Sequence, residues 1–261
     1  MADATHDGDV ALLKEAGAEA ARIALSFFRK DPEVWTKDGG SPVSEADLAV
    51  DKFLKTTLCG ARPDYGWLSE ESADNPDRLE RSHAFVVDPI DGTKAFVRGS
   101  EDWTVSLAVV NEGRPVAATL IAPAVEKTWW ATAEGGTYEN GGRLAAAHPK
   151  TLANARWVTP RRFIPRIEGV TGPIRRKYVN SLAYRLAFVA EGEVDAAIVS
   201  ADSRDWDLAA ADLLVQEAGA RLTDLSGDLL RYNQRDTCRP MLVASVPEVF
   251  GQIVDIVGDA R

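Results

Sequence analysis

The spacing of hydrophobic residues changes twice along this 261-residue chain, and these changes restrict the folds open to it. Apolar residues recur at helical spacing over residues 9–29, and a second helical pattern follows Ser44, which is placed to cap it. From Trp103 to Leu144, short runs separated by Gly and Asn turn residues predict an antiparallel meander. The rest of the chain alternates, with helices expected at 182–191, 207–218 and 249–257 and strands at 196–200 and 241–245.

This order of patterns predicts an α+β fold, a layered α/β/α/β/α sandwich. Its N-terminal part would hold paired helices and a mixed, largely antiparallel sheet, and a smaller alternating α/β half would follow. Residues 145–173 look irregular and form the expected junction. We therefore divide the chain into a domain 1–145, which carries most of the candidate metal ligands, and a domain 146–261, which carries Asp207.

The balance of charge limits the partners of the chain. Thirty basic and forty acidic residues give a net charge of −10, which disfavours nucleic-acid polymers and acidic membranes. A small anionic substrate stays possible, because bound cations can invert the local potential. No charge-free run approaches the roughly 20 apolar residues that span a bilayer. Asp3, Asp7 and Asp9 stand where a secretory signal would have basic and then apolar residues, so we expect a cytoplasmic protein.

The sharpest chemical signal is Asp88-Pro89-Ile90-Asp91-Gly92-Thr93, directly after Ala84–Val87, an apolar run suited to a buried strand. Two carboxylates at a strand end can present oxygens to one hard cation, with a backbone carbonyl between them as a further ligand. Gly92 would let the backbone approach a ligand, and a helical turn beginning at Thr93 would offer N–H groups to an anion. Taken alone, this segment fits an Asx-type turn equally well.

Three further acidic positions lie at predicted element boundaries. Glu70-Glu71 follows a short strand that ends at Trp67-Leu68, and such a pair alone is more typical of solvated loop charges. Asp207, in Trp206-Asp207-Leu208-Ala209-Ala210, could simply cap the helix that follows. Asp47 completes a Ser44-x-x-Asp47 capping box, which is the default interpretation of that pair.

In this order and with these neighbours, the acidic segments resemble the inositol monophosphatase superfamily of Mg²⁺-dependent phosphomonoesterases. The resemblance extends from Ser41-Pro42-Val43-Ser44-Glu45-Ala46-Asp47 to the WDLAA segment, and DPIDGT with a downstream WDxAA is highly specific. It implies a small phosphorylated substrate, two or three Mg²⁺ ions, inhibition by lithium and a homodimer.

The resemblance also implies a role for each acidic position. Glu70, Asp88 and the Ile90 carbonyl would bind one Mg²⁺, and Asp88, Asp91 and Asp207 would bind a second. Asp47, paired with Thr93, would orient or deprotonate the attacking water, which is compatible with capping only if its second oxygen stays free. The implied catalytic residues are Asp47, Thr93 and Glu70, and the implied substrate-binding residues are Asp91, Gly92, Thr93, Arg185 and Asp207.

Two features bear on the identity of the phosphate ester. Basic residues outnumber acids between Arg156 and Lys177, which indicates either a solvated loop or a second anion site. By the resemblance, Arg185 lies where inositol monophosphatases tend to carry an acid and 3′(2′),5′-bisphosphate nucleotidases a base. Taken alone, Arg185 fits an exposed helix charge. Gly92-Thr93-Lys94-x-Phe96 also looks more like the nucleotidase and histidinol-phosphatase branches.

We therefore predict a Mg²⁺-dependent phosphatase, closest to the 3′(2′),5′-bisphosphate nucleotidases, that converts adenosine 3′,5′-bisphosphate to AMP and phosphate. Inositol-1-monophosphatase and histidinol-phosphatase activities are alternatives with the same mechanism. A non-catalytic, metal-dependent binding or regulatory module is another, although binding alone would not need the Asp47–Thr93 pair. A sugar-binding or scaffold protein would show no metal dependence of its stability.

Overall fold

The helices and strands follow the order of the hydrophobic patterns over residues 4–37, 40 and 42–258, which the computed structural model describes. The α-helices are α1 (Ala4–Phe27), α2 (Glu45–Ala61), α3 (Thr93–Val97), α4 (Ile164–Thr171), α5 (Leu182–Ala190), α6 (Asp205–Glu217) and α7 (Pro247–Val257). The first strands are β1 (Val34–Thr36), β2 (Pro42–Ser44), β3 (Gly66–Ser69), β4 (His83–Asp91), β5 (Thr104–Asn111), β6 (Arg114–Ala122), β7 (Lys127–Thr132), β8 (Gly136–Glu139) and β9 (Gly142–Arg143). The later strands are β10 (Arg156–Val158), β11 (Arg175–Arg176), β12 (Ala196–Val199), β13 (Ser203–Arg204), β14 (Arg221–Asp224), β15 (Cys238–Arg239) and β16 (Leu242–Ser245).

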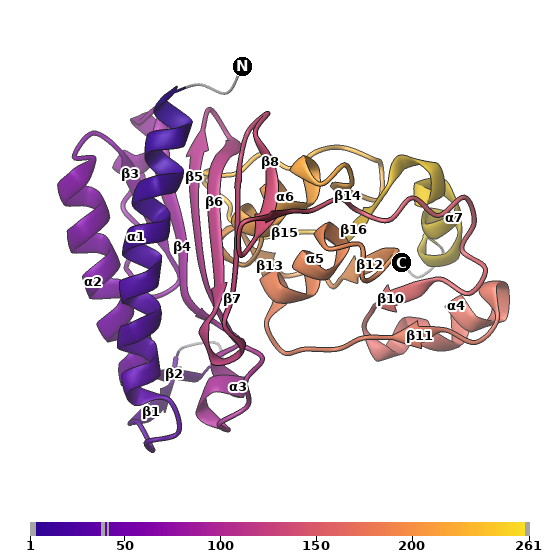
Figure 1. Ribbon diagram of the computed structural model, residues 1–261, viewed down its shortest axis with the longest axis horizontal. Helices are drawn as coiled ribbons and strands as arrows, with labels where there is room; N and C mark the ends of the chain where they lie inside the picture. Colours follow the sequence, from indigo (N-terminus) through magenta and orange to yellow (C-terminus); the bar gives the residue numbers. More distant parts are fainter. Residues whose placement is uncertain (1–3, 38–39, 41, 259–261) are drawn as a thin grey trace.

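These elements stack in five layers (Figure 1). Helices α1 and α2 cover one face of a seven-stranded sheet, and α5 and α6 lie between that sheet and a five-stranded one. Helices α4 and α7 lie beyond the five-stranded sheet. The predicted α/β/α/β/α sandwich is therefore confirmed.

The larger sheet has the strand order β3-β4-β5-β6-β7-β8-β9, in which β3 and β4 are parallel and every other pair is antiparallel. Two of its turns have only two residues, Glu112-Gly113 and Asn140-Gly141, and all four have positive φ. Such turns have the twist that an antiparallel hairpin needs. They account for the predicted meander, which the structure confirms.

Strand β4 is apolar throughout its centre because both of its faces are buried. Phe85 and Val87 pack in the cluster with α1 and α2, whereas Val86 packs in the cluster with α5 and α6. None of the three is more than 1% exposed. A strand covered on both sides gives a continuous hydrophobic run rather than an alternating one.

Several predicted helix boundaries differ from the structure by one to five residues. Helix α1 begins at Ala4 rather than at residue 9, and it ends at Phe27 rather than at residue 29, beyond which Arg29 has a φ of 58°. Helix α6 begins at Asp205, so Asp207 is the third residue of the helix and not the cap itself. Between α1 and α2, positions 38, 39 and 41 lie outside the described residues, and Pro42 and Val43 belong to β2.

The prediction that residues 145–173 are irregular is wrong. This segment contains β10 and α4, and β10 pairs in parallel with both β11 and β12. Strand β14 was also not predicted, and it pairs with β16. Strand β10 has only three residues, and β14 contains one apolar residue, so neither forms the apolar run that marks β12 and β16 in the sequence.

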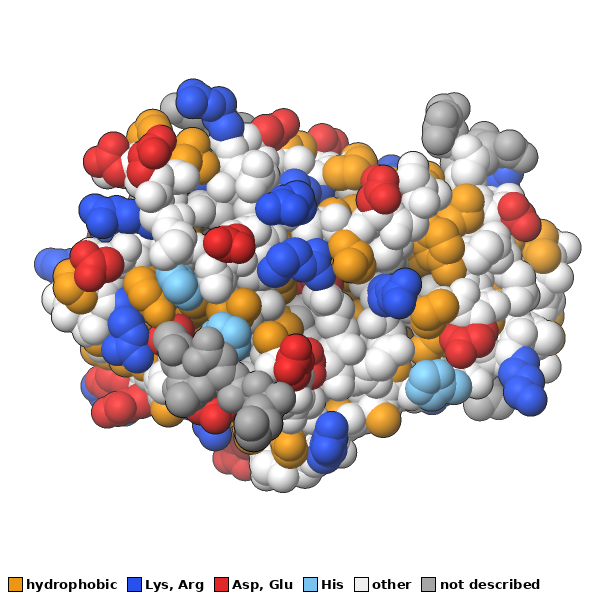
Figure 2. Space-filling view, turned by 90° about the horizontal axis from the view of Figure 1, so that it is seen from above, with side chains coloured by type: hydrophobic (Ala, Val, Ile, Leu, Met, Phe, Trp, Pro, Cys, Tyr) orange, Lys and Arg blue, Asp and Glu red, His pale blue; other side chains and the backbone are white. Residues whose placement is uncertain are grey.

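Charged side chains of both signs are interspersed over the face that Figure 2 shows. The net charge of −10 therefore does not gather into one acidic surface on that face. Within the described ranges, no helix combines the length and the apolar character that a membrane span requires.

Candidate active site

The site begins at an irregularity near the end of β4. Asp88 lies opposite Ser106 of β5 and Asp91 lies opposite Thr104, so three steps along β4 match two along β5. In a regular strand, residues three apart face opposite sides of the sheet. The extra residue changes this alternation, and both carboxylates line the same cavity.

The backbone turns sharply immediately after Asp91. Gly92 has a φ of 95°, in the left-handed region that favours glycine, and it caps the short helix α3. A Cβ atom at this position would lie 3.1 Å from the Ser181 backbone nitrogen and 3.2 Å from the Asp102 carbonyl oxygen. Both the conformation and the close approach therefore require glycine here.

Three carboxylates from separate elements meet at this end of the sheet. Glu70 follows β3, and its backbone N–H donates to the Val87 carbonyl of the parallel strand β4 at 3.2 Å. Asp207 comes from the first turn of α6. Glu70, Asp88 and Asp207 each offer a carboxylate oxygen, and these oxygens lie within 4.8 Å of one another. The three predicted ligand positions are thus brought together.

Repulsion between the carboxylates of this cluster favours the binding of a cation. Burial, together with the charges of Glu70, Asp91 and Asp207, holds the pKa of Asp88 well above its usual value. Burial and the charge of Asp91 raise the pKa of Asp207 to about 8. Clustered carboxylates repel one another unless protons or cations neutralise them. An all-oxygen donor set of this kind suits a hard divalent cation such as Mg²⁺.

Asp91 has a different set of partners from the other three. Its carboxylate accepts hydrogen bonds from the Ser181 hydroxyl at 2.6 Å, the Leu182 N–H at 3.1 Å and the Ala183 N–H at 2.7 Å. It therefore satisfies donors at the N-terminus of α5. Burial raises the pKa of Asp91, and these hydrogen bonds and the charge of Arg185 oppose that rise.

Asp47 divides its two oxygens between two tasks. Oδ2 accepts from the Ser44 N–H at 2.9 Å and from the Ser44 hydroxyl at 2.6 Å, as expected at the start of α2. Oδ1 lies 3.1 Å from the Thr93 hydroxyl, which is also 3.0 Å from the Ile90 carbonyl oxygen. Capping by Asp47 is therefore compatible with its implied role beside Thr93, because capping uses only Oδ2.

Arg185 lines the same cavity, which has a volume of about 310 Å³. Its Nε donates to the Ser181 carbonyl at 3.2 Å and its Nη2 donates to the Asn180 carbonyl at 2.7 Å. These two bonds fix the plane of the guanidinium group. The remaining lining residues are Pro42, Glu70, Asp88, Asp91, Gly92, Thr93, Lys94, Tyr178, Asn180 and Asp207.

Sequence reasoning missed several residues around the site, of which Lys37 is the most closely placed. The Lys37 ammonium lies 3.0 Å from an oxygen of Glu70 and 2.6 Å from an oxygen of Glu71. Burial lowers the pKa of Lys37, but the two glutamates outweigh that effect and raise it overall. Pro42, Tyr178 and Asn180 line the cavity, whereas Lys37 contacts it only through Glu70. The residues around Lys37 and Tyr178 form no motif, so no sequence signal pointed to them.

The described side chains of the basic run between Arg156 and Lys177 have other partners than this cavity. Arg156 pairs with Asp195 at 2.7 Å, and Lys177 pairs with Glu193. Among the side chains that the structure describes, none from this run lines the cavity. The run lies largely in β10, α4 and β11 rather than in a loop, and the ion pairs of Arg156 and Lys177 do not favour a second anion site.

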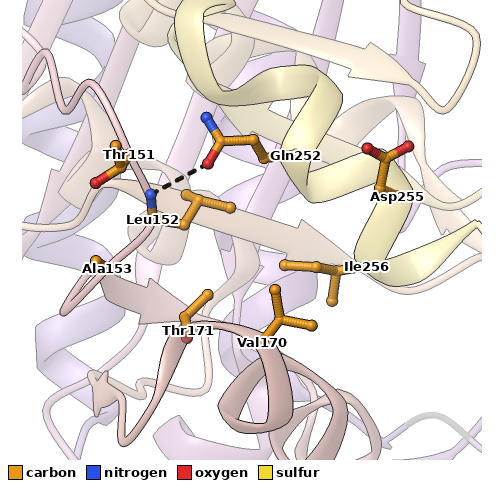
Figure 3. A pocket seen from close by; sticks show the side chains of 8 residues that line it. All are labelled: Thr151, Leu152, Ala153, Val170, Thr171, Gln252, Asp255 and Ile256. Atoms are coloured by element: carbon orange, nitrogen blue, oxygen red, sulfur yellow. Dashed lines mark hydrogen bonds between the residues drawn. The ribbon is translucent and has the colours of Figure 1, made fainter.

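A second, larger pocket of about 400 Å³ lies between α4, α7 and residues 151–153 (Figure 3). Asp255 is the one charged residue in its lining, which also includes Val170, Ile256 and Gln252. The Leu152 N–H donates to the side-chain oxygen of Gln252 at 3.4 Å (Figure 3). This pocket has no group of carboxylates, and its size does not make it the better candidate for phosphate chemistry.

Comparison with known proteins agrees with this geometry. A family model described as "Inositol monophosphatase family" matches residues 5–249. A histidinol-phosphatase of Mycobacterium tuberculosis is 36% identical over 241 residues, which cover 85% of this chain and 89% of that protein. The 3′(2′),5′-bisphosphate nucleotidase CysQ of Haemophilus influenzae is 27% identical over 238 residues, which cover 84% and 85%. The structure of an IMPase from Thermotoga maritima matches with a TM-score of 0.84 and 25% identity over 96% of each chain.

Proposed function

The chain belongs to the inositol monophosphatase family and is an enzyme that hydrolyses phosphate monoesters, and we propose that its substrate is adenosine 3′,5′-bisphosphate. The products would be AMP and inorganic phosphate. The observation that supports this substrate is the position of Arg185 in the wall of the cavity that also contains Glu70, Asp88 and Asp207. A guanidinium group with a fixed plane is well suited to a second phosphate group.

We propose Mg²⁺ as the cofactor, in two or three copies. Glu70, Asp88 and Asp207 would be ligands, and Asp91 and the Ile90 carbonyl would complete the set predicted from the sequence. Bound Mg²⁺ would neutralise the charge of the phosphate group and make a nearby water molecule more acidic. The acidic cluster supports this assignment because its oxygens already lie close enough to share a cation.

Asp47 and Thr93 would then handle the proton of the attacking water. The Thr93 hydroxyl would accept a proton from water and pass its own to Oδ1 of Asp47, so each atom keeps its valence. The water oxygen would form a bond to phosphorus as the bond from phosphorus to the ester oxygen breaks, and the leaving oxygen would take up a proton from solvent water to become a hydroxyl group. The Thr93–Asp47 contact of 3.1 Å supports this route, and Ser44 would hold the other carboxylate oxygen in place through its two hydrogen bonds.

Histidinol phosphate is the second candidate substrate. It is favoured by the 36% identity to a histidinol-phosphatase, which exceeds the 27% identity to the nucleotidase. A non-catalytic binding module, the alternative of another class, does not fit a chain that belongs to a family of phosphate monoester hydrolases. The Asp47–Thr93 pair would also have no task in binding alone.

Phosphate release from three esters tests the substrate assignment. Adenosine 3′,5′-bisphosphate, histidinol phosphate and inositol 1-phosphate are compared at equal concentration, with Mg²⁺ and with a chelator. We expect the bisphosphate to give the highest kcat/KM, and the chelator to abolish all three activities. A preference for either monophosphate of more than about tenfold, or about 1.4 kcal/mol in transition-state stabilisation, would replace the proposed substrate.

We also propose a homodimer, a cytoplasmic location and inhibition by lithium, on the family resemblance and the charge of the chain. Light scattering of the purified protein tests the first of these. A mass of one chain at micromolar concentration would contradict it. The division into domains 1–145 and 146–261 likewise remains a proposal.

A further inference from the structure

Tyr178 stands out among the residues around the active-site cavity. It is a large aromatic side chain with 54% of its surface exposed, in a cavity whose floor consists of carboxylates. Exposed aromatic side chains at the wall of a polar site often provide stacking surfaces for planar rings. This makes Tyr178 a candidate for recognising the part of the substrate that is not phosphate.

The backbone on both sides of Tyr178 is anchored. The Lys177 N–H donates to the Trp157 carbonyl at 2.9 Å. The backbone N–H and the side-chain amide of Asn180 both donate to one oxygen of Asp102, at 2.5 and 2.6 Å. The short connection into α5 is thus held in place, which limits how far the backbone at Tyr178 can move.

Arg185 fixes the other side of this arrangement. Its guanidinium carbon lies 5.4 Å from the centre of the Tyr178 ring. Hydrogen bonds from Arg185 to the Ser181 and Asn180 carbonyls hold the guanidinium group in that position. The cation and the aromatic ring therefore form one preorganised wall of the cavity, with one charged part and one planar part.

We propose that Tyr178 is a specificity-determining residue that stacks on a planar nitrogen heterocycle carried by the substrate, while Arg185 contacts an anionic group. The inference rests on the proposed function, because the phosphate ester must reach the acidic cluster for its ring to reach Tyr178. The shared chemistry is a heteroaromatic ring on a phosphate monoester. A purine in a nucleotide and an imidazole in histidinol phosphate both have it, and inositol phosphate does not.

Binding of product-like ligands tests the inference without depending on turnover. AMP and ribose 5-phosphate differ only in the base, so the ratio of their Kd values, measured by titration calorimetry with Ca²⁺ present, isolates the contribution of the ring. We expect the wild type to bind AMP about tenfold more tightly than ribose 5-phosphate, in line with base–aromatic stacking. Tyr178→Ala should bring the ratio close to one, and Tyr178→Phe should keep it. Equal binding of the two ligands by the wild type, or an unchanged ratio in Tyr178→Ala, would overturn stacking on a purine. Only a rise in KM confined to histidinol phosphate, in the kinetic experiment below, would then support stacking on an imidazole.

KM values for the three esters distinguish a purine from an imidazole as the ring that stacks on Tyr178. Tyr178→Ala should raise KM for adenosine 3′,5′-bisphosphate about tenfold, with kcat and the KM for inositol 1-phosphate changed less than twofold. A rise confined to histidinol phosphate would assign the stacking surface to an imidazole instead. An equal rise in KM for all three esters, or no rise for any of them, would show that Tyr178 does not stack on a ring of the substrate. If no ester is hydrolysed by the wild type, the proposed function fails, whereas the AMP and ribose 5-phosphate comparison still reports on Tyr178.

Discussion

Asp47 and Thr93 lie 46 positions apart in the sequence, and their side chains meet at a distance of 3.1 Å between Oδ1 and Oγ1. The contact joins the first turn of α2 to the first residue of α3. It is possible because Ser44 binds only the other oxygen of Asp47. Asp47 therefore caps α2 with Oδ2 and contacts Thr93 with Oδ1.

Replacing Thr93 tests whether this contact serves the reaction. Thr93→Val keeps the shape of the side chain and removes its hydroxyl, so we expect kcat to fall by at least about a hundredfold, as for the loss of a general acid–base group. Thr93→Ser keeps the hydroxyl and should keep most of the activity. Steady-state kinetics measure both. A Thr93→Val enzyme with nearly full kcat would show that the proton takes another route.

Asp88→Asn should lower the activity of the enzyme and raise the stability of its metal-free form. The substitution removes a candidate metal ligand, so turnover should fall by at least about a hundredfold. It also removes one of several mutually repelling carboxylates, so the chelator-treated variant should unfold at a higher temperature than chelator-treated wild type. Thermal unfolding with and without Mg²⁺ checks this.

The control for this experiment is Asp255→Asn, which removes a carboxylate from the pocket shown in Figure 3. Mg²⁺ should stabilise this control as much as it stabilises wild type, since any ligand that binds only the folded state stabilises it by mass action. Asp88→Asn should lose most of that stabilisation. Equal Mg²⁺ effects on all three proteins would place the metal elsewhere.

Arg185→Gln should weaken bisphosphate recognition selectively. The substitution keeps a long polar side chain but removes the charge, so KM for adenosine 3′,5′-bisphosphate should rise about tenfold or more, as expected for a charge-assisted contact to phosphate. KM for inositol 1-phosphate should change little. Arg98→Gln makes the same change of charge outside the lining of the cavity and serves as the control. Similar effects on both substrates would remove the evidence for a second phosphate site.

The stability of the fold should depend on pH through Asp212, which lies outside the candidate site. Its carboxylate is fully buried and accepts hydrogen bonds from the Tyr232 hydroxyl at 3.0 Å and the Gln216 amide at 2.9 Å. Burial raises its pKa from 3.8 to about 6, although the charge of Arg114 opposes this. The folded state therefore holds more protons than the unfolded state between these two values.

It follows that the free energy of unfolding decreases as pH rises from about 4 to about 6, by at most about 3 kcal/mol from this group. Asp212→Asn cannot lose a proton, so the variant should gain stability relative to wild type as pH rises through that window. Urea unfolding of both proteins at about pH 5 and about pH 7.5 measures the difference. A constant difference between them would contradict the raised pKa.

Sequence patterns predicted the parts of the fold whose period is long enough to see. The run Ala84–Val87 and the meander after Trp103 are examples, because buried strands and two-residue turns leave clear signals. Strands β10 and β14 have three and four residues and depend on their partners in the five-stranded sheet. Neither contains the apolar run by which β12 and β16 of the same sheet were predicted.

In the candidate site, too, sequence patterns predicted some residues and could not predict others. Glu70 directly follows β3, Asp88 lies near the end of β4 and Asp207 lies in the first turn of α6, so their residue types and positions were informative. Lys37 and Tyr178 reach the site through tertiary packing, and a lone lysine or tyrosine in a loop has no distinctive neighbours in the sequence. The bonds from Asp91 to α5 were likewise unpredictable, because they join segments 90 to 92 positions apart.

Those bonds have a consequence for how the enzyme can change its substrate. Asp91 ties the beginning of α5 to the end of β4, and Arg185 lies on the first turn of the same helix. The guanidinium group that we propose to contact the ester is therefore held at a set position relative to the carboxylates that we propose to bind the metal. On that proposal, substitutions at position 185 would alter which ester is accepted and would leave the metal ligands in place, so selectivity could evolve separately from the chemistry.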